Sequence, residues 1–136
     1  MKNKFTDLID ILRKLRAPDG CDWDKTQTHE SLIPYLLEET YEVIEAIQNK
    51  DYNSLKEELG DLLLHIIFQA ELAKEKNEFD IYNSIENISN KLINRHPHIF
   101  SSDKNNDSWE TENWELIKQK EKKRTSLLEG VPKTLP

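Results

Sequence analysis

The sequence is poor in the residues on which several familiar kinds of function depend. Its 136 residues include only three glycines and one cysteine, and 8% of them are aromatic. Three widely spaced glycines cannot build the glycine-rich loops that hold phosphate in P-loop and dinucleotide-binding proteins. The lone Cys21 excludes an internal disulfide and a cysteine-based zinc site, and it favours a reducing, cytoplasmic setting.

Long apolar runs and surplus positive charge are also missing. The longest nearly continuous apolar run, 62–68, is far short of the roughly 20 residues that cross a bilayer, and residues 1–5 do not resemble a secretory signal. Twenty-six acidic residues against 19 basic ones give a net charge of −7, which opposes attraction to nucleic acid and anionic lipid. We therefore expect a soluble protein that binds neither a nucleic acid polymer nor a membrane.

Leucine, isoleucine, glutamate and lysine dominate the chain, and no segment shows the period-two alternation of a strand. The sequence predicts an all-α fold, with a single domain over 1–126 and a tail or the start of a linker over 127–136. Five helices are expected, at about 4–15, 31–49, 54–76, 80–95 and 108–124.

Local signals give these helices their predicted ends. Ser54 and Glu57 have the spacing of a capping box at the start of the third helix. Asp80 can cap the fourth helix, whose apolar stripe is 81, 85, 88 and 92, and Pro97 ends it. The segment 16–28 contains proline, glycine and several polar residues, so we predict a loop there, with Trp23 buried beneath it.

Acidic residues are concentrated on two helices. Glu38, Glu39, Glu42 and Glu45 share about a third of the circumference of the second helix, a pattern that an ordinary solvent-facing side would also give. The third helix differs, because apolar residues surround it from Leu62 onward and predict burial on every side. A narrow polar stripe nevertheless runs along it, made of Glu58, Asp61, His65 and Gln69.

Buried carboxylates are unfavourable unless a cation neutralises them. If the second and third helices run antiparallel across the short turn at 49–53, Glu39 and Glu42 face Glu58 and Asp61. A hard divalent cation with oxygen ligands would relieve their repulsion, so we expect Mg²⁺, with Mn²⁺ as a possible substitute. A di-iron site is excluded because no glutamate stands three residues before a histidine. His65 is expected to be a hydrogen-bonded core histidine rather than a catalytic base.

Two motifs that follow each other along the chain resemble those of a known family. Glu38-Glu39-Thr40-Tyr41-Glu42 followed by Glu58-Leu59-Gly60-Asp61 is similar to the metal motif of the MazG nucleoside triphosphate pyrophosphohydrolases, all-α Mg²⁺ enzymes related to dimeric dUTPases. Further segments resemble the same family, at 20–24, 27–29, 91–100 and 114–118. The chain departs from the family in having Asp22 where proline is usual. A segment like 131–136 often leads into a second domain in that family.

The resemblance implies a helical bundle completed by dimerisation, in a homodimer or higher homo-oligomer. It implies hydrolysis of nucleoside triphosphates between the α and β phosphates, as nucleotide-pool house-cleaning, with Glu38, Glu39, Glu42, Glu58 and Asp61 as catalytic residues. All of these except Glu38 would be metal ligands. Substrate would be bound by Lys91, Arg95, Trp114, Lys118 and Trp23. The alternative function is a catalytically weak module of a larger protein that binds Mg²⁺, nucleotide or another protein.

Overall fold

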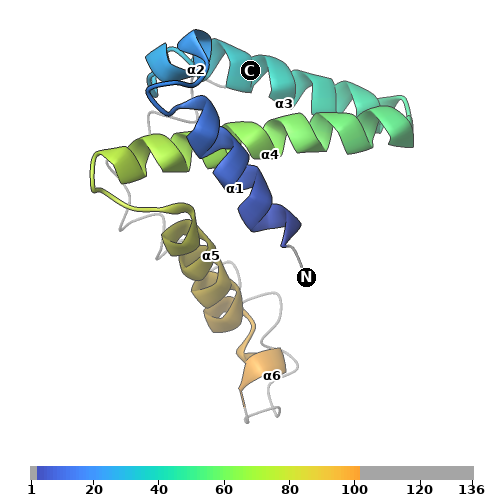
Figure 1. Ribbon diagram of the computed structural model, residues 1–136. Coiled ribbons are helices and arrows are strands. Elements are labelled where there is room, and N and C mark those ends of the chain that lie inside the picture. Colours follow the sequence, from blue (N-terminus) through green and yellow to red (C-terminus); the bar gives the residue numbers. More distant parts are fainter. Residues whose placement is uncertain (1–2, 102–136) are drawn as a thin grey trace. The chain divides into compact units, whose positions relative to one another are not determined.

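The computed structural model describes residues 3–101, and every regular element in that range is an α-helix, as the sequence predicts. The helices are α1 (Lys4–Leu15), α2 (Asp22–Thr26), α3 (Ile33–Gln48), α4 (Tyr52–Glu75), α5 (Ile81–Arg95) and α6 (Pro97–Phe100) (Figure 1). The predicted helix at 108–124 and the tail at 127–136 lie outside the described residues. None of these six helices combines the length and the apolar character that crossing a bilayer requires.

The chain divides into two units, Met1–Ser84 and Ile85–Pro136, and each is described by itself. In the first unit, α3 and α4 lie side by side and run in opposite directions, while α1 crosses α4 (Figure 1). The predicted antiparallel pair of acidic helices is therefore confirmed.

The turn between α3 and α4 is a Schellman motif. The Asp51 N–H donates to the Ala46 carbonyl and the Lys50 N–H to the Ile47 carbonyl, each at 3.1 Å. Lys50 takes the left-handed conformation that this motif requires, with φ of 55°. The chain thus reverses within three residues, which brings the last turns of α3 beside the first turns of α4.

The predicted capping box at Ser54 is wrong, because α4 begins two residues earlier, at Tyr52, with Asp51 as its N-cap. The Asp51 carboxylate accepts the Ser54 N–H at 3.1 Å and the Ser54 hydroxyl at 2.8 Å. A carboxylate has two acceptor oxygens, so it takes both donors of the serine. The predicted cap of the fourth helix is confirmed, since Asp80 accepts the Asn83 N–H at 3.0 Å.

Two short helices were not predicted. Within the segment expected to be a loop, α2 forms a little over one turn, and its Trp23 is 48% exposed rather than buried. Helix α5 ends before Pro97 as predicted, but Pro97 then starts α6. A proline suits the first turn of a helix, where its missing N–H would have no intrahelical partner.

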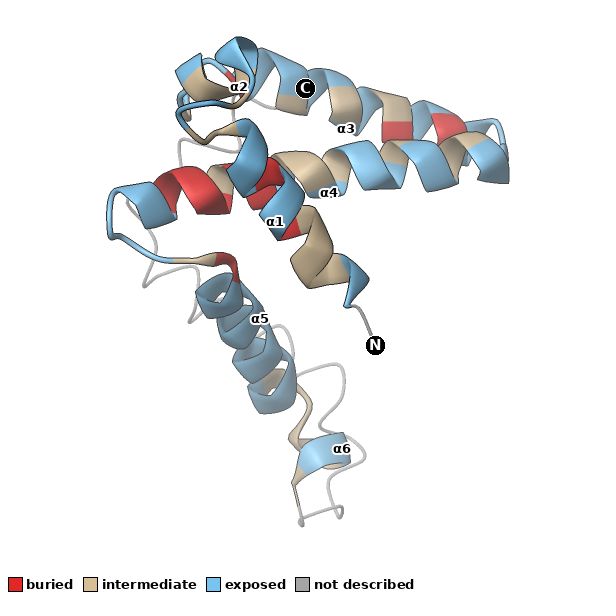
Figure 2. Cartoon of the chain, viewed as in Figure 1, coloured by how far each residue is buried: buried red, intermediate tan, exposed pale blue. Residues whose placement is uncertain are grey.

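The core of the first unit lies where α1 crosses the second half of α4 (Figure 2). Its buried members are Ile9, Leu12, Leu32, Ile67, Phe68, Ala70, Leu72 and Ile81. The expectation that α4 is buried on every side is wrong. Leu63 and Ile66 are 36% and 48% exposed, because the described helices cover α4 on its α1 and α3 sides only.

The apolar stripe predicted for α5 is likewise buried only at its first residue. Ile81 is 4% exposed, whereas Ile85, Ile88 and Leu92 are all more than 40% exposed. Within the described residues, α5 therefore presents an apolar face without a covering layer.

Two arginine forks fasten α1 to α4. Arg13 donates to both oxygens of Glu71, at 2.8 and 3.1 Å, and Arg16 donates to both oxygens of Glu75, at 2.7 Å each. The Glu71 side chain is only 5% exposed. A buried carboxylate needs such a partner, because an unpaired charge in the interior is strongly unfavourable.

We predict that Arg13→Ala lowers the free energy of unfolding by about 2 kcal/mol, because it leaves the Glu71 carboxylate buried without its cation. This is below the usual effect for a fully buried pair, since the Arg13 side chain is 43% exposed. Urea unfolding measures the change. Lys14→Ala, at the neighbouring exposed position, should change stability by less than about 0.5 kcal/mol, and equal losses in the two variants would contradict the assignment.

Candidate functional site

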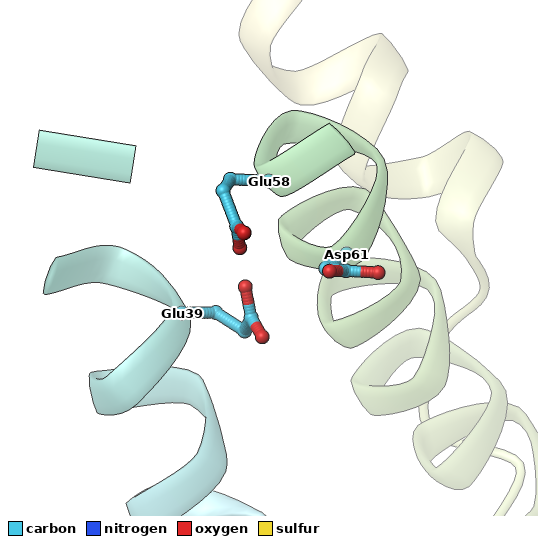
Figure 3. Close-up of side chains that lie close together, drawn as sticks. All are labelled: Glu39, Glu58 and Asp61. Atoms are coloured by element: carbon cyan, nitrogen blue, oxygen red, sulfur yellow. The ribbon is translucent and has the colours of Figure 1, made fainter. Parts of the chain in front are cut away.

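Three carboxylates meet between α3 and α4. Glu39 on α3 and Glu58 and Asp61 on α4 each contribute one oxygen to a group whose atoms all lie within 4.8 Å of one another. The Glu39 and Glu58 side chains extend toward each other across the gap between the helices, and Asp61 lies beside them on α4 (Figure 3). Glu39 and Glu58 are half-buried and Asp61 is exposed. We call these three residues the acidic cluster.

The acidic cluster has no neutralising partner among residues 3–84, the described part of the first unit. The ion pairs found in this range involve Arg13, Arg16 and Lys25, none of which pairs with the cluster. One oxygen of Glu39 and one of Glu58, the Oε2 atom in each case, are buried and receive no hydrogen bond from the described residues. Buried oxygens of this kind are normally satisfied, so these two atoms indicate a missing partner.

The local electrostatics favour the protonated form of the facing carboxyls. Burial raises the pKa of Glu39, and the nearby charges of Asp61 and Glu42 raise it further. The pKa of Glu58 is raised chiefly by a hydrogen bond shared with Glu39, since one of the two carboxyls must keep a proton to donate it. Without a cation, these facing carboxyls therefore release their protons at higher pH than ordinary surface carboxyls do.

The remaining predicted carboxylates border the acidic cluster without joining it. Glu42 lies outside the group of three but is close enough to Glu58 that a shared hydrogen bond raises the pKa of Glu42. The charge of Glu38 acts on both Glu39 and Glu42. A pocket of about 290 Å³ continues from Glu42 and Glu58 toward the α3–α4 turn, where Asp51 also lines it.

An acidic cluster of this composition can hold a metal ion. Three carboxylates on two helices, with two buried oxygens unsatisfied, form the all-oxygen donor set that hard divalent cations prefer. The donor set therefore fits the predicted cofactor, and the cation would fill the place of the missing partner.

The five predicted substrate-binding residues lie on other elements or outside the described range. Trp23 stands on α2, and Lys91 and Arg95 stand one turn apart on α5, in the second unit. Trp114 and Lys118 lie outside the described residues. All five stay predictions as substrate-binding residues.

Sequence reasoning misjudged His65. The expected hydrogen bond to His65 is not found, because its buried Nδ1 atom receives no partner from the described residues. Burial lowers the pKa of His65, which favours the neutral ring. The Tyr35 ring lies against Trp23 and stands one helical turn before Glu39.

Comparisons with known proteins agree with this geometry. A sequence model of the MazG nucleotide pyrophosphohydrolase domain matches residues 27–100. The nucleoside triphosphate pyrophosphohydrolase/pyrophosphatase MazG of Thermotoga maritima is 49% identical over 118 residues, which cover 87% of this chain and 45% of that protein. The Escherichia coli K12 nucleoside triphosphate pyrophosphohydrolase is 44% identical over 139 residues, covering 98% and 53%.

A solved structure shares the fold. The crystal structure of a mazG-related protein from Thermotoga maritima aligns with a TM-score of 0.67 at 27% identity, covering 84% of this chain and 98% of that one. The chain spans about half the length of the two curated relatives.

We predict that Glu58→Gln raises the melting temperature of the metal-free protein by a few degrees at pH 7. Because the native pKa of Glu58 lies above its ordinary value of 4.5, the native state loses stability as the pH rises from 4.5 through the raised value. The gain over wild type should therefore grow between pH 4.5 and pH 7, as measured by thermal unfolding in a chelating buffer.

Added Mg²⁺ should stabilise the wild type but not this variant, because the substitution replaces one negatively charged ligand carboxylate with a neutral amide. Glu57→Gln, one residue away and exposed, is the matched control and should behave as wild type in both measurements. A Glu58→Gln protein that is less stable without metal, or equally stabilised by Mg²⁺, would refute the role assigned to the acidic cluster.

Proposed function

The chain belongs to the MazG nucleotide pyrophosphohydrolase family, and we propose that it hydrolyses nucleoside triphosphates between the α and β phosphates. Water would add to the α phosphorus while the bond to the bridging oxygen breaks, which gives a nucleoside monophosphate and pyrophosphate. The observation that carries this proposal is the acidic cluster with its two unsatisfied buried oxygens. No glycine-rich loop is needed if phosphate is held through a cation.

The proposed cofactor is Mg²⁺, with Mn²⁺ as a substitute, held by Glu39, Glu42, Glu58 and Asp61. A divalent cation bound there would offset the charge of the triphosphate and make a bound water more acidic. Glu38, next to these ligands, would hold a second cation or orient the attacking water. A triphosphate should bind poorly without the cation, because both partners are negatively charged.

Cationic and aromatic side chains outside the acidic cluster are proposed to hold the rest of the substrate. Lys91 offers one point charge, and Arg95 offers a forked donor that suits phosphate. Lys118 is a further phosphate candidate. Trp114 is proposed to stack on the base and Trp23 to close the mouth of the site. The resemblance to the family supports these roles.

A second candidate function follows from the length of the chain. Because it spans about half of the curated relatives, it could serve as a weakly active module of a larger protein that binds Mg²⁺, nucleotide or another protein. This candidate predicts Mg²⁺ binding without turnover.

We further propose that the chain forms a homodimer through the apolar faces of α3 and α4. Ile33, Leu37 and Ile44 on α3 and Leu59, Leu63 and Ile66 on α4 are all exposed in the single chain. Large exposed apolar patches are uncommon on monomers and are typical of subunit interfaces.

We predict that Asp61→Asn lowers Mg²⁺-dependent release of pyrophosphate by at least about a hundredfold. Replacing a residue that only orients a metal ligand already lowers activity strongly, and removing a ligand should lower it further. The assay uses a panel of nucleoside triphosphates with and without Mg²⁺. Glu57→Gln should keep wild-type rates and circular dichroism should show unchanged helicity. A wild type that releases no pyrophosphate from any member of the panel would rule out the enzymatic proposal.

We predict that the double substitution Leu63→Glu and Ile66→Glu converts a dimer to a monomer, since it places charges in the proposed interface. Sedimentation velocity measures the change. Ile11→Glu, at an exposed apolar position on α1, should leave the dimer intact. A monomeric wild type would contradict the proposal, and so would a dimeric double variant.

A further inference from the structure

Helix α2 has little packing of its own. None of its five residues is buried, and its N-cap residue, Cys21, gives it no side-chain hydrogen bond. An isolated helix of this length is not stable in water. Contacts with the longer helices must therefore hold α2 in place, and with it Trp23, which is proposed to close the mouth of the site.

One guanidinium group joins α2 to two of the longer helices. Arg16 is the C-cap of α1, and its side chain is only 11% exposed. Its Nη1 atom donates to the Asp24 carbonyl of α2. Its Nε and Nη2 atoms donate to the two carboxylate oxygens of Glu75 on α4, at 2.7 Å each. The centre of the Phe68 ring on α4 lies 5.4 Å from the same group. Arg16 therefore connects α1, α2 and α4.

The bond to Asp24 is made where a helix needs an outside donor. The last carbonyls of a helix have no partner within it, and a cation there also suits the helix dipole. The Trp23 carbonyl accepts from the Thr26 hydroxyl and the Gln27 amide, at 3.1 and 2.9 Å. Those donors belong to α2 or its C-cap and would move with it. Arg16 belongs to another helix, so its bond fixes where α2 lies.

The segments on either side of α2 are attached without Arg16. Before α2, the Cys21 N–H donates to the Leu15 carbonyl at the end of α1, at 2.8 Å. After it, a hydrogen bond of 2.5 Å joins Nδ1 of His29 to the side-chain oxygen of Gln69, and the Gln69 amide donates to the His29 carbonyl at 3.2 Å. Removing the Arg16 side chain would therefore loosen α2 between two attached points without detaching it from the protein.

Arg13 provides an internal comparison. It stands three residues before Arg16 on α1 and makes the same kind of fork, to Glu71 on α4. Both of its hydrogen bonds go to α4, whereas Arg16 makes a third bond, to α2. If Arg16 only fastened α1 to α4, replacing either arginine would have the same kind of effect.

We propose that Arg16 is a positioning residue for substrate binding, which holds α2 so that Trp23 lies at the mouth of the site before substrate arrives. This inference rests on the proposed function. An element that is already in place loses less entropy when it contacts a ligand. Where only a fraction of the molecules has that element in place, the apparent dissociation constant rises in inverse proportion to that fraction. Arg16 would act on the substrate through α2 and not by contact.

The test compares Arg16→Ala with Arg13→Ala. Calorimetry measures binding of a nonhydrolysable α,β-methylene nucleoside triphosphate with Mg²⁺, at a temperature where circular dichroism shows both variants folded. Arg16→Ala should raise the dissociation constant about tenfold, the change expected if α2 is in place in about one molecule in ten. Arg13→Ala should bind as wild type despite its loss of stability. In hydrolysis assays, Arg16→Ala should raise KM and leave kcat unchanged.

A spin label reports on α2 directly. Because Cys21 is the only cysteine, Cys21→Ser with Thr26→Cys places one nitroxide on the exposed last residue of α2. The label should become more mobile with Arg16→Ala and stay unchanged with Arg13→Ala. Glu75→Ala removes the acceptor of the Arg16 fork, so it should change both affinity and label mobility in the same direction as Arg16→Ala.

Equal losses of affinity in the two arginine variants, or an unchanged label in Arg16→Ala, would overturn the inference. If Arg16→Ala does not fold, Arg16→Lys gives the same comparison, since a lysine ammonium can pair with Glu75 but lacks the planar fork that also reaches Asp24. Calorimetry and the label need no turnover. A wild type that releases no pyrophosphate but gives these differences would refute the proposed function and keep this inference.

Discussion

The repulsion among carboxylates held between two antiparallel helices is the constraint on which the rest of this structure depends. Glu39 and Glu58 extend toward each other, the described part of the first unit supplies no cation to them, and their Oε2 atoms receive no hydrogen bond from the described residues. Only Val43 and Ala46 are buried in this half of α3. The acidic end of the helical pair is therefore weakly packed, while the main core lies around the second half of α4 and holds the first unit together without it.

Helix α4 shows that the chain can neutralise a buried acid. Glu71, between three and four turns after Glu58, is nearly inaccessible and is held by two N–H donors on one edge of the Arg13 guanidinium. Glu58, on the same helix, has no such arginine. Because the two acids differ in partner rather than in secondary structure, the missing counter-charge at Glu58 is a local property of this site. A cation that binds from solution explains that difference better than a general tolerance of buried charge.

The sequence was sufficient for the four longer helices of the described range and for the acidic cluster, because both depend on local spacing. Periodicity set the ends of α3 and α4 to within two residues, and the short turn required Glu39 to face Glu58. Burial was harder to predict. The apolar residues around α4 suggested burial on every side, but apolar character is compatible with a surface kept for another subunit, as at Leu63. The exposure of Trp23 depends on how Arg16 holds α2, a contact between distant segments that no local pattern encodes.

The angular order of side chains around α3 explains how a second copy could bind without blocking the cation site. At about 100° per residue, Ile33, Leu37 and Ile44 fall within about 40° of one another, and Glu38, Glu42 and Glu45 fall within about 60° on a different side. The side that packs on α4, which carries Val43 and Ala46, is a third. A subunit covering the apolar side would leave the acidic side open to substrate. The proposed dimerisation and the proposed nucleotide binding would therefore use different faces of the same helix.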